Sequence, residues 1–132
     1  MIIERLKVRI FTGTDIIEIN RIKQSIDELG DSFKNRIYTE KEIKYCESKK
    51  NAKYQHYAAR FAAKEAIFKA VSRLLEDKFS LSWKDAEIVN DENGKPEVKF
   101  LIDILDDKIE NIDISISHCK EYAVANVVVI GK

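Results

Sequence analysis

The chain has 132 residues, of which 45% are hydrophobic and 35% charged, and its 23 basic residues are balanced by 23 acidic ones. This length fits a single domain spanning residues 1–132, and the zero net charge argues against a general nucleic-acid binder, which would be strongly basic. The chain has no apolar run long enough to span a membrane, a charged N-terminus unlike a secretory signal, and two cysteines without disulfide or metal-site spacing, so we expect a cytoplasmic protein with no membrane partner.

The first predicted elements are a strand and an amphipathic helix. Residues 6–12 alternate as a strand would, and the turn-forming residues 13–15 are expected to end it. A helix should begin near Ile16 and stop before Gly30, because glycine readily forms the left-handed turn after a helix. Its core face is predicted from four apolar residues at helical spacing: Ile19, Ile22, Ile26 and Leu29.

Three further helical segments are predicted between residues 31 and 75. Residues 31–37 suit a short helical turn, and the capping box from Thr39 to Glu42 predicts a helix from about residue 40. A long helix should follow from about Ala52 to Leu75. One face of it carries the small apolar stripe Ala63, Ala66, Ile67, Ala70 and Leu74, and Glu65, Lys69 and Ser72 point the other way.

The last third of the sequence predicts strands. Trp83 to Val89 and Pro96 to Ile102 should form a hairpin, closed by a type I′ turn at Asn93-Gly94. Residues 103–110 suit a short acidic helix or a loop, and residues 113–117 and 122–130 suit a closing hairpin. We therefore expect an α+β fold, with an antiparallel sheet packed against helices.

Glu65 and Lys69 stand out, because they place an acid and a base in an alanine-rich helix. A surface ion pair between residues i and i+4 contributes only about 0.2–0.5 kcal/mol, and it would explain the pair without any function. Their neighbours Ala58, Phe61 and Phe68 are apolar, which argues against a fully solvated helix face. A partly buried carboxylate needs a partner or a metal ion.

Two other polar positions are candidates for chemistry. Asp15 follows a strand and a glycine, and alone it reads as a helix N-cap. His118 follows two serines at a strand end, and alone it reads as a turn histidine, although it could bind phosphate. Together, Asp15 and Glu65 with lysines nearby suit a hard cation such as Mg²⁺, which takes oxygen ligands and shares them with substrate phosphates.

Five segments in this order resemble the holo-acyl-carrier-protein synthases, the small 4′-phosphopantetheinyl transferases. They are GTDIIEINRI, FKNRIYTEKE, ARFAAKEAIFKA, NDENGKP and SISHCKEYAVA, and the resemblance runs from about Val8 to Ile130. It implies transfer of phosphopantetheine from coenzyme A to a serine of apo-acyl carrier protein, with release of adenosine 3′,5′-bisphosphate. It also implies a homotrimer with active sites at subunit interfaces and a role in fatty acid biosynthesis.

The resemblance assigns roles residue by residue. Asp15 and Glu65 match the family's Mg²⁺ ligands, Lys69 matches the lysine that meets the phosphate under attack, and His118 matches the histidine of the coenzyme A site. The remaining matches lie around the nucleotide: Arg60, Lys64, Asn93, Gly94, Lys95 and Pro96. The serine's proton could pass to a carboxylate or to a water on the metal.

The predicted helix after Asp15 is a candidate docking site for the carrier protein. With its isoleucines turned inward, Arg21, Lys23 and Gln24 are left nearer the solvent, and Arg36 lies in the next segment. Acyl carrier proteins are acidic, so these side chains could guide association electrostatically. The ordinary alternative is a solvated helix face.

The sequence departs from the family in several places, including Cys119, where a small hydroxyl residue is common. Phe11 replaces the first of two glycines that often precede the aspartate, and residues 72–80 replace a glycine-rich loop that follows the long helix. Two other functions are alternatives: a metal-dependent nuclease, whose Glu-x-Lys motif lies on a strand, and a non-catalytic binding module with a degraded site.

Overall fold

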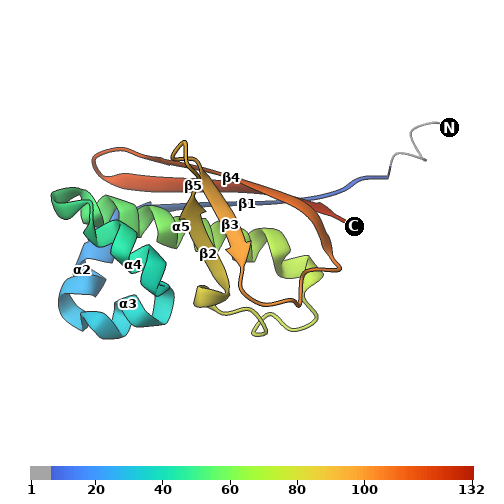
Figure 1. Ribbon diagram of the computed structural model, residues 1–132, viewed down its shortest axis with the longest axis horizontal. Helices are drawn as coiled ribbons and strands as arrows, with labels where there is room; N and C mark the ends of the chain where they lie inside the picture. Colours follow the sequence, from blue (N-terminus) through green and yellow to red (C-terminus); the bar gives the residue numbers. More distant parts are fainter. Residues whose placement is uncertain (1–6) are drawn as a thin grey trace.

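The computed structural model describes residues 7–132, so Leu6, the first residue of the predicted first strand, lies outside the described part. A three-stranded antiparallel sheet with the order β1-β5-β4 forms one layer (Figure 1). Its strands are β1 (Arg9–Glu18), β4 (Ile109–His118) and β5 (Tyr122–Gly131). β4 and β5 form the predicted closing hairpin, and the α+β class is confirmed.

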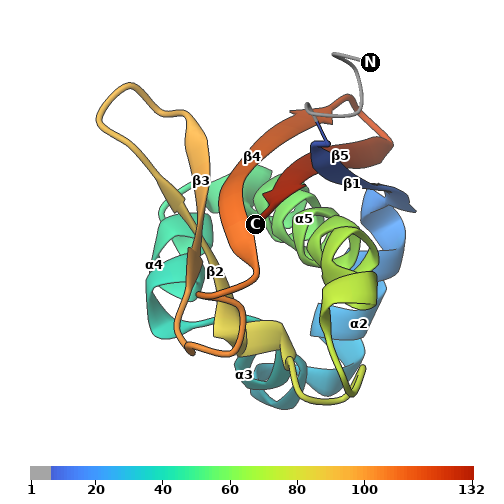
Figure 2. The ribbon, with the colours of Figure 1, turned by 90° about the vertical axis from the view of Figure 1, so that its right-hand side faces the viewer.

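The long helix α5 (Lys53–Val71) lies against β1 and β5 and is extended at each end by a 3-10 turn, η1 (Lys50–Ala52) and η2 (Ser72–Leu74) (Figure 2). β1 can approach it closely because Gly13 has no side chain. A Cβ atom at Gly13 would lie 1.9 Å from the carbonyl oxygen of Ala66. The predicted strand end at residues 13–15 is therefore wrong: β1 runs through Asp15 to Glu18, paired throughout with β5.

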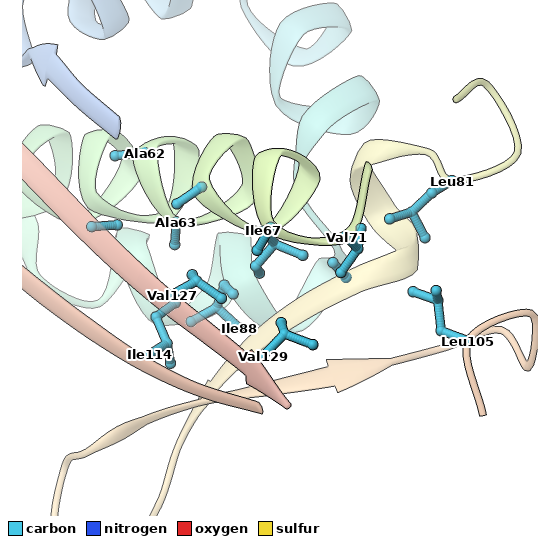
Figure 3. Packing of buried hydrophobic residues seen from close by; sticks show 14 of the residues in the cluster. Ala62, Ala63, Ile67, Val71, Leu81, Ile88, Leu105, Ile114, Val127 and Val129 are labelled. Carbon is cyan, nitrogen blue, oxygen red and sulfur yellow. The ribbon is translucent and has the colours of Figure 1, made fainter. Parts of the chain in front are cut away.

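The main core lies between α5 and the sheet (Figure 3). Alanines on α5 allow close packing against the valines of β5. Larger side chains such as Leu74, Leu81 and Leu105 fill the core near the C-terminal end of α5. The predicted helix stripe is confirmed, since all five of its residues are buried. Labelled members of this core include Ala63, Ile67, Val71, Ile114, Val127 and Val129.

Three short helices cover the N-terminal half of α5. They are α2 (Ile19–Leu29), α3 (Asp31–Ile37) and α4 (Glu40–Glu47), and the predicted capping box opens α4. α2 begins at Ile19 rather than near Ile16, because residues 16–18 stay paired in β1. Leu29, predicted to face the core, is 56% exposed. Gly30 ends α2 with a positive φ of 57° as expected.

The second sheet is the hairpin of β2 (Ala86–Asn90) and β3 (Pro96–Phe100), preceded by the 3-10 turn η3 (Trp83–Asp85). Trp83 is therefore not part of the strand. The turn is not type I′, which needs positive φ at two residues: among the described residues of this loop only Gly94 has one. The backbone N–H of Gly94 bonds to Asp91, and that of Asp91 to Lys95, as in a type I turn with a bulge.

Residues 101–108 form a loop of turns, so the loop alternative is confirmed there. Within residues 7–132, no helix is long and apolar enough to cross a membrane.

Candidate active site

A cavity of about 480 Å³ opens between β1, α2 and α5, and it brings together three of the residues predicted to do chemistry. Asp15 enters it from β1, and Glu65 and Lys69 enter it from α5. Alternation along β1 places Asp15 on the same face as Gly13, which contacts α5. The i,i+4 spacing places Glu65 and Lys69 on one side of the helix.

Lys69 is held by β1 and not by Glu65. Its Nζ atom donates a hydrogen bond to the carbonyl oxygen of Thr14 at 2.9 Å and lies 3.3 Å from Oδ1 of Asp15. More than half of the Lys69 side chain is exposed, so its ammonium group can meet an incoming anion. The surface pair between Glu65 and Lys69, the functionless alternative, is not formed.

Glu65 is a half-buried carboxylate without a basic partner among the described residues. Across residues 7–132, no basic side chain forms an ion pair with it within 4.0 Å. Burial raises its pKa, the negative charge of Asp15 raises it further, and Lys69 opposes both effects. A bound cation would relieve this unfavourable ionisation.

The donor set fits a hard cation only in part. Asp15 and Glu65 supply carboxylate oxygens from two elements, as Mg²⁺ prefers. In the described chain, however, no group of three or more His, Cys, Asp or Glu side chains could hold a metal ion. The two carboxylates therefore fit Mg²⁺ if ligand phosphates and water complete the coordination.

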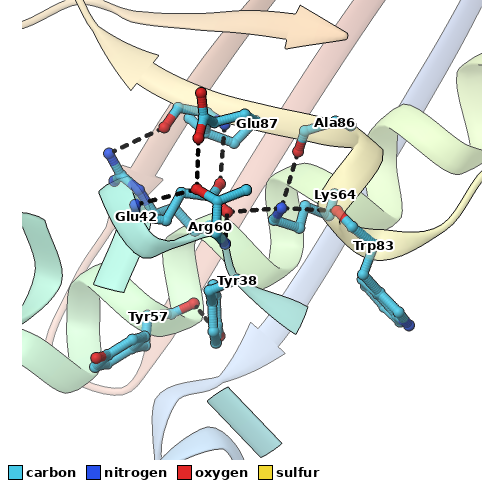
Figure 4. A network of polar contacts seen from close by, with 10 residues as sticks. Tyr38, Glu42, Tyr57, Arg60, Lys64, Trp83, Ala86 and Glu87 are labelled. Atoms are coloured by element: carbon cyan, nitrogen blue, oxygen red, sulfur yellow. Dashed lines mark hydrogen bonds and ion pairs between the residues drawn. The ribbon is translucent and has the colours of Figure 1, made fainter. Parts of the chain in front are cut away.

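Lys64, predicted to lie near the nucleotide, is instead part of a buried network (Figure 4). Its three ammonium protons have three partners: Oε1 of Glu42 at 2.8 Å and the carbonyl oxygens of Trp83 and Ala86 at 2.8 and 2.9 Å. Glu42 also accepts the backbone N–H of Ile88 at 2.9 Å. Lys64 thus ties α4, α5 and the β2–β3 hairpin together and has no proton left for a ligand.

Arg60, the second predicted nucleotide contact on α5, is only 4% exposed. One of its terminal nitrogens donates to Oδ1 of Asn90 at 2.7 Å, and its guanidinium carbon lies 4.0 Å from the ring centre of Tyr45. Its Nε atom has no hydrogen-bond partner in the described chain. The structure therefore places Arg60 mainly as a link between α5 and the hairpin.

His118 and the hairpin tip do not line the cavity of their own chain. The His118 ring lies 5.8 Å from that of His56, near the start of α5, whereas Lys69 lies in its last turn. The tip of the hairpin, which carries Asn93 to Pro96, projects beyond the body of the molecule (Figure 2). Lys95 at this tip pairs with Asp113 at 2.7 Å.

The predicted docking residues separate into two groups. Arg21 lines the cavity, and its neighbours Lys23 and Gln24 are exposed, as is Arg36 on α3. Lys23 turns towards Tyr54, with its Nζ 5.6 Å from the ring centre. Sequence reasoning missed the wall residues Ser25, Phe33 and Phe61. Phe33 carried no signal beyond its place in a helix, since its position depends on how α3 folds back.

Comparisons with known proteins identify the family of the chain. Residues 12–127 match the family described as the 4′-phosphopantetheinyl transferase superfamily. The holo-(acyl-carrier-protein) synthase of Ruminiclostridium cellulolyticum is 45% identical over 123 residues, with 89% of each chain covered. The corresponding protein of Geobacter sp. is 51% identical over 88 residues, covering 67% of this chain and 68% of its own.

Solved structures of the same fold include complexes. The synthase of Bacillus anthracis, in complex with CoA (3′,5′-ADP), superposes with a TM-score of 0.77 at 37% identity, covering 96% of this chain and all of its own. The synthase of Helicobacter pylori in complex with coenzyme A gives a TM-score of 0.77 at 31% identity, covering 89% and 98%. The chain therefore belongs to the 4′-phosphopantetheinyl transferase superfamily and, within it, to the family of the holo-(acyl-carrier-protein) synthases.

Proposed function

We propose that the protein transfers 4′-phosphopantetheine from coenzyme A to a serine of an acyl carrier protein in a Mg²⁺-dependent reaction. The observation that carries this proposal is the meeting of Asp15, Glu65 and Lys69 in one cavity, with Glu65 left without a basic partner among the described residues. The family assignment displaces the nuclease alternative. The three side chains are all in place, which argues against a degraded site.

In this reaction the serine oxygen forms a bond to the phosphorus that carries the pantetheine arm. The pyrophosphate P–O bond breaks, adenosine 3′,5′-bisphosphate leaves, and the serine proton passes to a base. Lys69 offsets negative charge on the phosphate under attack, since its ammonium group lies at the cavity wall beside Asp15. No nucleophile is needed from this chain, because the partner supplies the serine.

Asp15 and Glu65 are the residues that would hold the metal ion. When bound, Mg²⁺ would neutralise part of the pyrophosphate charge and favour its departure. The carboxylates contribute by supplying fixed oxygen ligands from β1 and α5, two elements held together by the close contact at Gly13. This preorganisation orients the phosphates before the serine arrives.

We further propose a homotrimer whose active sites lie at subunit interfaces. The sheet face opposite α5 is open and carries Ile10, Ile16 and Val128, which are 61%, 64% and 39% exposed. Apolar area of this kind typically marks a contact with another chain. A shared site would also explain why His118 and the hairpin tip lie away from their own cavity: a neighbouring subunit would supply them. Sedimentation equilibrium should give three times the monomer mass, and a fully active monomer would contradict the shared site.

We place the reaction in the cytoplasm and in fatty acid biosynthesis. Both cysteines are free thiols, Cys46 buried and Cys119 exposed, which suits a reducing compartment. Carrier proteins with a phosphopantetheine arm are the substrates that the family resemblance implies.

Mass spectrometry of apo-acyl carrier protein tests the proposal. Incubation with the protein, coenzyme A and Mg²⁺ should add one phosphopantetheine group to the carrier. EDTA should stop the reaction and added Mg²⁺ should restore it. An unchanged carrier mass with all components present would overturn the proposed function.

A further inference from the structure

The β2–β3 hairpin is fastened to the body of the molecule along one edge of β2. In the described chain β2 pairs only with β3, and its other edge receives buried basic side chains from α5 (Figure 4). Lys64 donates to the carbonyl oxygen of Ala86. Arg60 donates to the carbonyl oxygen of Ile88 at 3.5 Å and to Oδ1 of Asn90 at 2.7 Å. Alternate residues of an edge strand are therefore bound by one helix.

The spacing of the two basic residues on the helix matches the spacing of their partners on the strand. Arg60 and Lys64 lie four residues apart on α5, which is roughly 6 Å along the helix axis. Two residues of an extended strand span roughly 7 Å. This attachment reaches as far as Asn90, and the turn that follows projects beyond the body of the molecule (Figure 2).

Asn90 carries the attachment from the body into the turn. Its Oδ1 accepts a hydrogen bond from Arg60, and its Nδ2 donates one to the carbonyl oxygen of Gly94 at 3.0 Å. A guanidinium group has only donors and a carbonyl group is only an acceptor, so the side chain between them must offer one of each. A carboxamide meets this requirement, and a carboxylate or an apolar side chain does not.

The peptide unit between Gly94 and Lys95 is held at both of its polar groups. Its carbonyl oxygen accepts from Asn90, and its N–H group donates to Oδ1 of Asp91 at 2.8 Å. The same Oδ1 accepts the backbone N–H of Asn93 at 2.8 Å. Asp91 thus shapes the turn from within, whereas Asn90 links it to a buried group on α5.

A second attachment of the turn is more exposed. Lys95 pairs with Asp113 on β4 at 2.7 Å, but the two side chains are 54% and 71% exposed, and such ion pairs contribute little to stability. Arg60 is only 4% exposed and lies between Asn90 and the ring of Tyr45. The orientation of the turn therefore depends mainly on the buried link.

We propose that Asn90 is a positioning residue for the nucleotide of the donor. It transmits the fixed position of Arg60 to the Gly94–Lys95 peptide and so holds the turn in the orientation in which it meets a donor bound at a neighbouring subunit. This inference rests on the proposed function, in which residues 93–96 lie around the nucleotide. Because Glu65 follows Arg60 by five residues on α5, one helix would support its own cavity and that of a neighbour.

Asn90→Asp separates this role from a merely structural one. The substitution keeps an acceptor for Arg60, strengthened by its charge, and removes the donor to Gly94. The melting temperature should not fall. The KM for coenzyme A should rise roughly three- to tenfold, the size of one lost hydrogen bond. The kcat value and the KM for the carrier protein should stay constant. A side chain that only satisfied Arg60 would leave the KM for coenzyme A unchanged.

Asn111→Asp is the matched control, because it makes the same chemical change on β4. Oδ1 of Asn111 accepts the backbone N–H of Ile112 at 2.9 Å, and an aspartate can keep this bond. Asn111 also lines the same cavity as Lys95, so the added charge lies near the turn. The KM for coenzyme A should stay near the wild-type value. Equal increases in both variants, or an increase that added salt removes, would assign the effect to charge and refute the positioning role.

Amide hydrogen exchange of the donor-free protein tests the attachment without any activity. In Asn90→Asp the amides of residues 93–97 should exchange roughly three- to tenfold faster, because local opening no longer breaks the bond to Gly94. Asn111→Asp should exchange at the wild-type rate. Unchanged exchange in Asn90→Asp would mean that the attachment does not hold the turn.

Titration calorimetry separates this inference from the proposed function. Asn90→Asp should bind adenosine 3′,5′-bisphosphate roughly three- to tenfold more weakly and 4′-phosphopantetheine as tightly as wild type. Equal affinities of the two proteins for adenosine 3′,5′-bisphosphate would overturn the inference. If wild-type protein gives no transfer to the carrier but Asn90→Asp still binds adenosine 3′,5′-bisphosphate more weakly, the proposed function fails and the role of Asn90 stands.

Discussion

Helix α5 contributes to two acid–lysine constellations, and the charges are already paired in only one of them. Lys64 and Glu42 are completely buried, 2.8 Å apart, and every proton of the ammonium group has a partner. Glu65 and Lys69, one position and five positions further along, line an open cavity, and Glu65 has no basic partner within the described residues. The same residue types build the fold on one side of the helix and leave room for a ligand on the other.

A charge is available for chemistry only where it is accessible and not already paired. A buried ion pair with complete hydrogen bonding is costly to break and offers nothing to a substrate. A cation would stabilise the ionised form of a half-buried carboxylate whose pKa is raised, and this makes Glu65 a candidate functional residue. Accessibility and pairing, more than residue type, separate the two roles.

The largest effect is expected from Glu65→Gln. The substitution keeps the size of the side chain but removes the charge that would hold the metal, so transfer should fall by roughly 10²- to 10³-fold or more, as for loss of other charge-stabilising groups. The melting temperature at pH 7 should not fall, because the ionised carboxylate is unfavourable in the folded state. Wild-type turnover in this variant would show that Glu65 has no part in the reaction.

Lys64→Met should act on stability and not on chemistry. Removing the ammonium leaves Glu42 charged and buried, which costs about 3–5 kcal/mol in the free energy of unfolding. The double variant Lys64→Met/Glu42→Gln should recover part of this loss, because it removes the stranded charge. Urea denaturation of both variants measures it. A single variant as stable as wild type would contradict the structural role assigned to Lys64.

Two glutamates should give opposite pH signatures in the metal-free protein. Hydrogen bonds from Tyr57 and Lys34 lower the pKa of Glu47, so its contribution to stability is present above the unfolded-state pKa and is lost as pH falls through the lower folded value. The pKa of Glu65 is raised, so its contribution is fully present at low pH and is lost as pH rises through the raised value.

Glu47→Gln should therefore cost about 1 kcal/mol or less at pH 7, since the carboxylate is well exposed, and the cost should shrink as pH falls through the lowered pKa of Glu47. Glu65→Gln should cost nothing at pH 7 or at lower pH. Thermal unfolding across pH 3–8 compares the two variants directly. A loss of stability in Glu65→Gln that grows with pH would mean that Glu65 has a cationic partner in the folded protein.

The smallest effect is expected from Arg21→Glu. Arg21 lies at the rim of the cavity on α2, where an acidic carrier protein would approach. Charge reversal should raise the KM for the carrier several-fold and leave that for coenzyme A nearly unchanged, and salt should reduce the difference because exposed charges are screened over about 8 Å. Arg36→Glu is the comparison on α3. Equal changes in both KM values would place Arg21 in the fold or the donor site instead.

Local signals in the sequence predicted most of the fold. The capping box at Thr39 and the stop at Gly30 depend on neighbouring residues, and both are where they were expected. The predicted end of the first strand is wrong because Gly13 does not form a turn. The reason for the glycine is tertiary: the backbone of α5 lies where a side chain would be. Such a close approach leaves no local signal.

Only part of the candidate site could be predicted, because tertiary contacts leave no local signal in the sequence. Asp15, Glu65 and Lys69 could be grouped from the resemblance, and the cavity brings them together. Lys64 could not be separated from its neighbour Glu65 by sequence alone, since only the packing of α4 and the β2–β3 hairpin against α5 shows that it is paired.

The open constellation of Asp15, Glu65 and Lys69 is proposed to bind the donor through a metal ion. Titration calorimetry of coenzyme A into wild type and Glu65→Gln, each with Mg²⁺ and with EDTA, tests it most directly. We predict that Mg²⁺ tightens binding to wild type by at least about tenfold, or about 1.4 kcal/mol, and has little effect on Glu65→Gln. The same Mg²⁺ dependence in both proteins would contradict the claim.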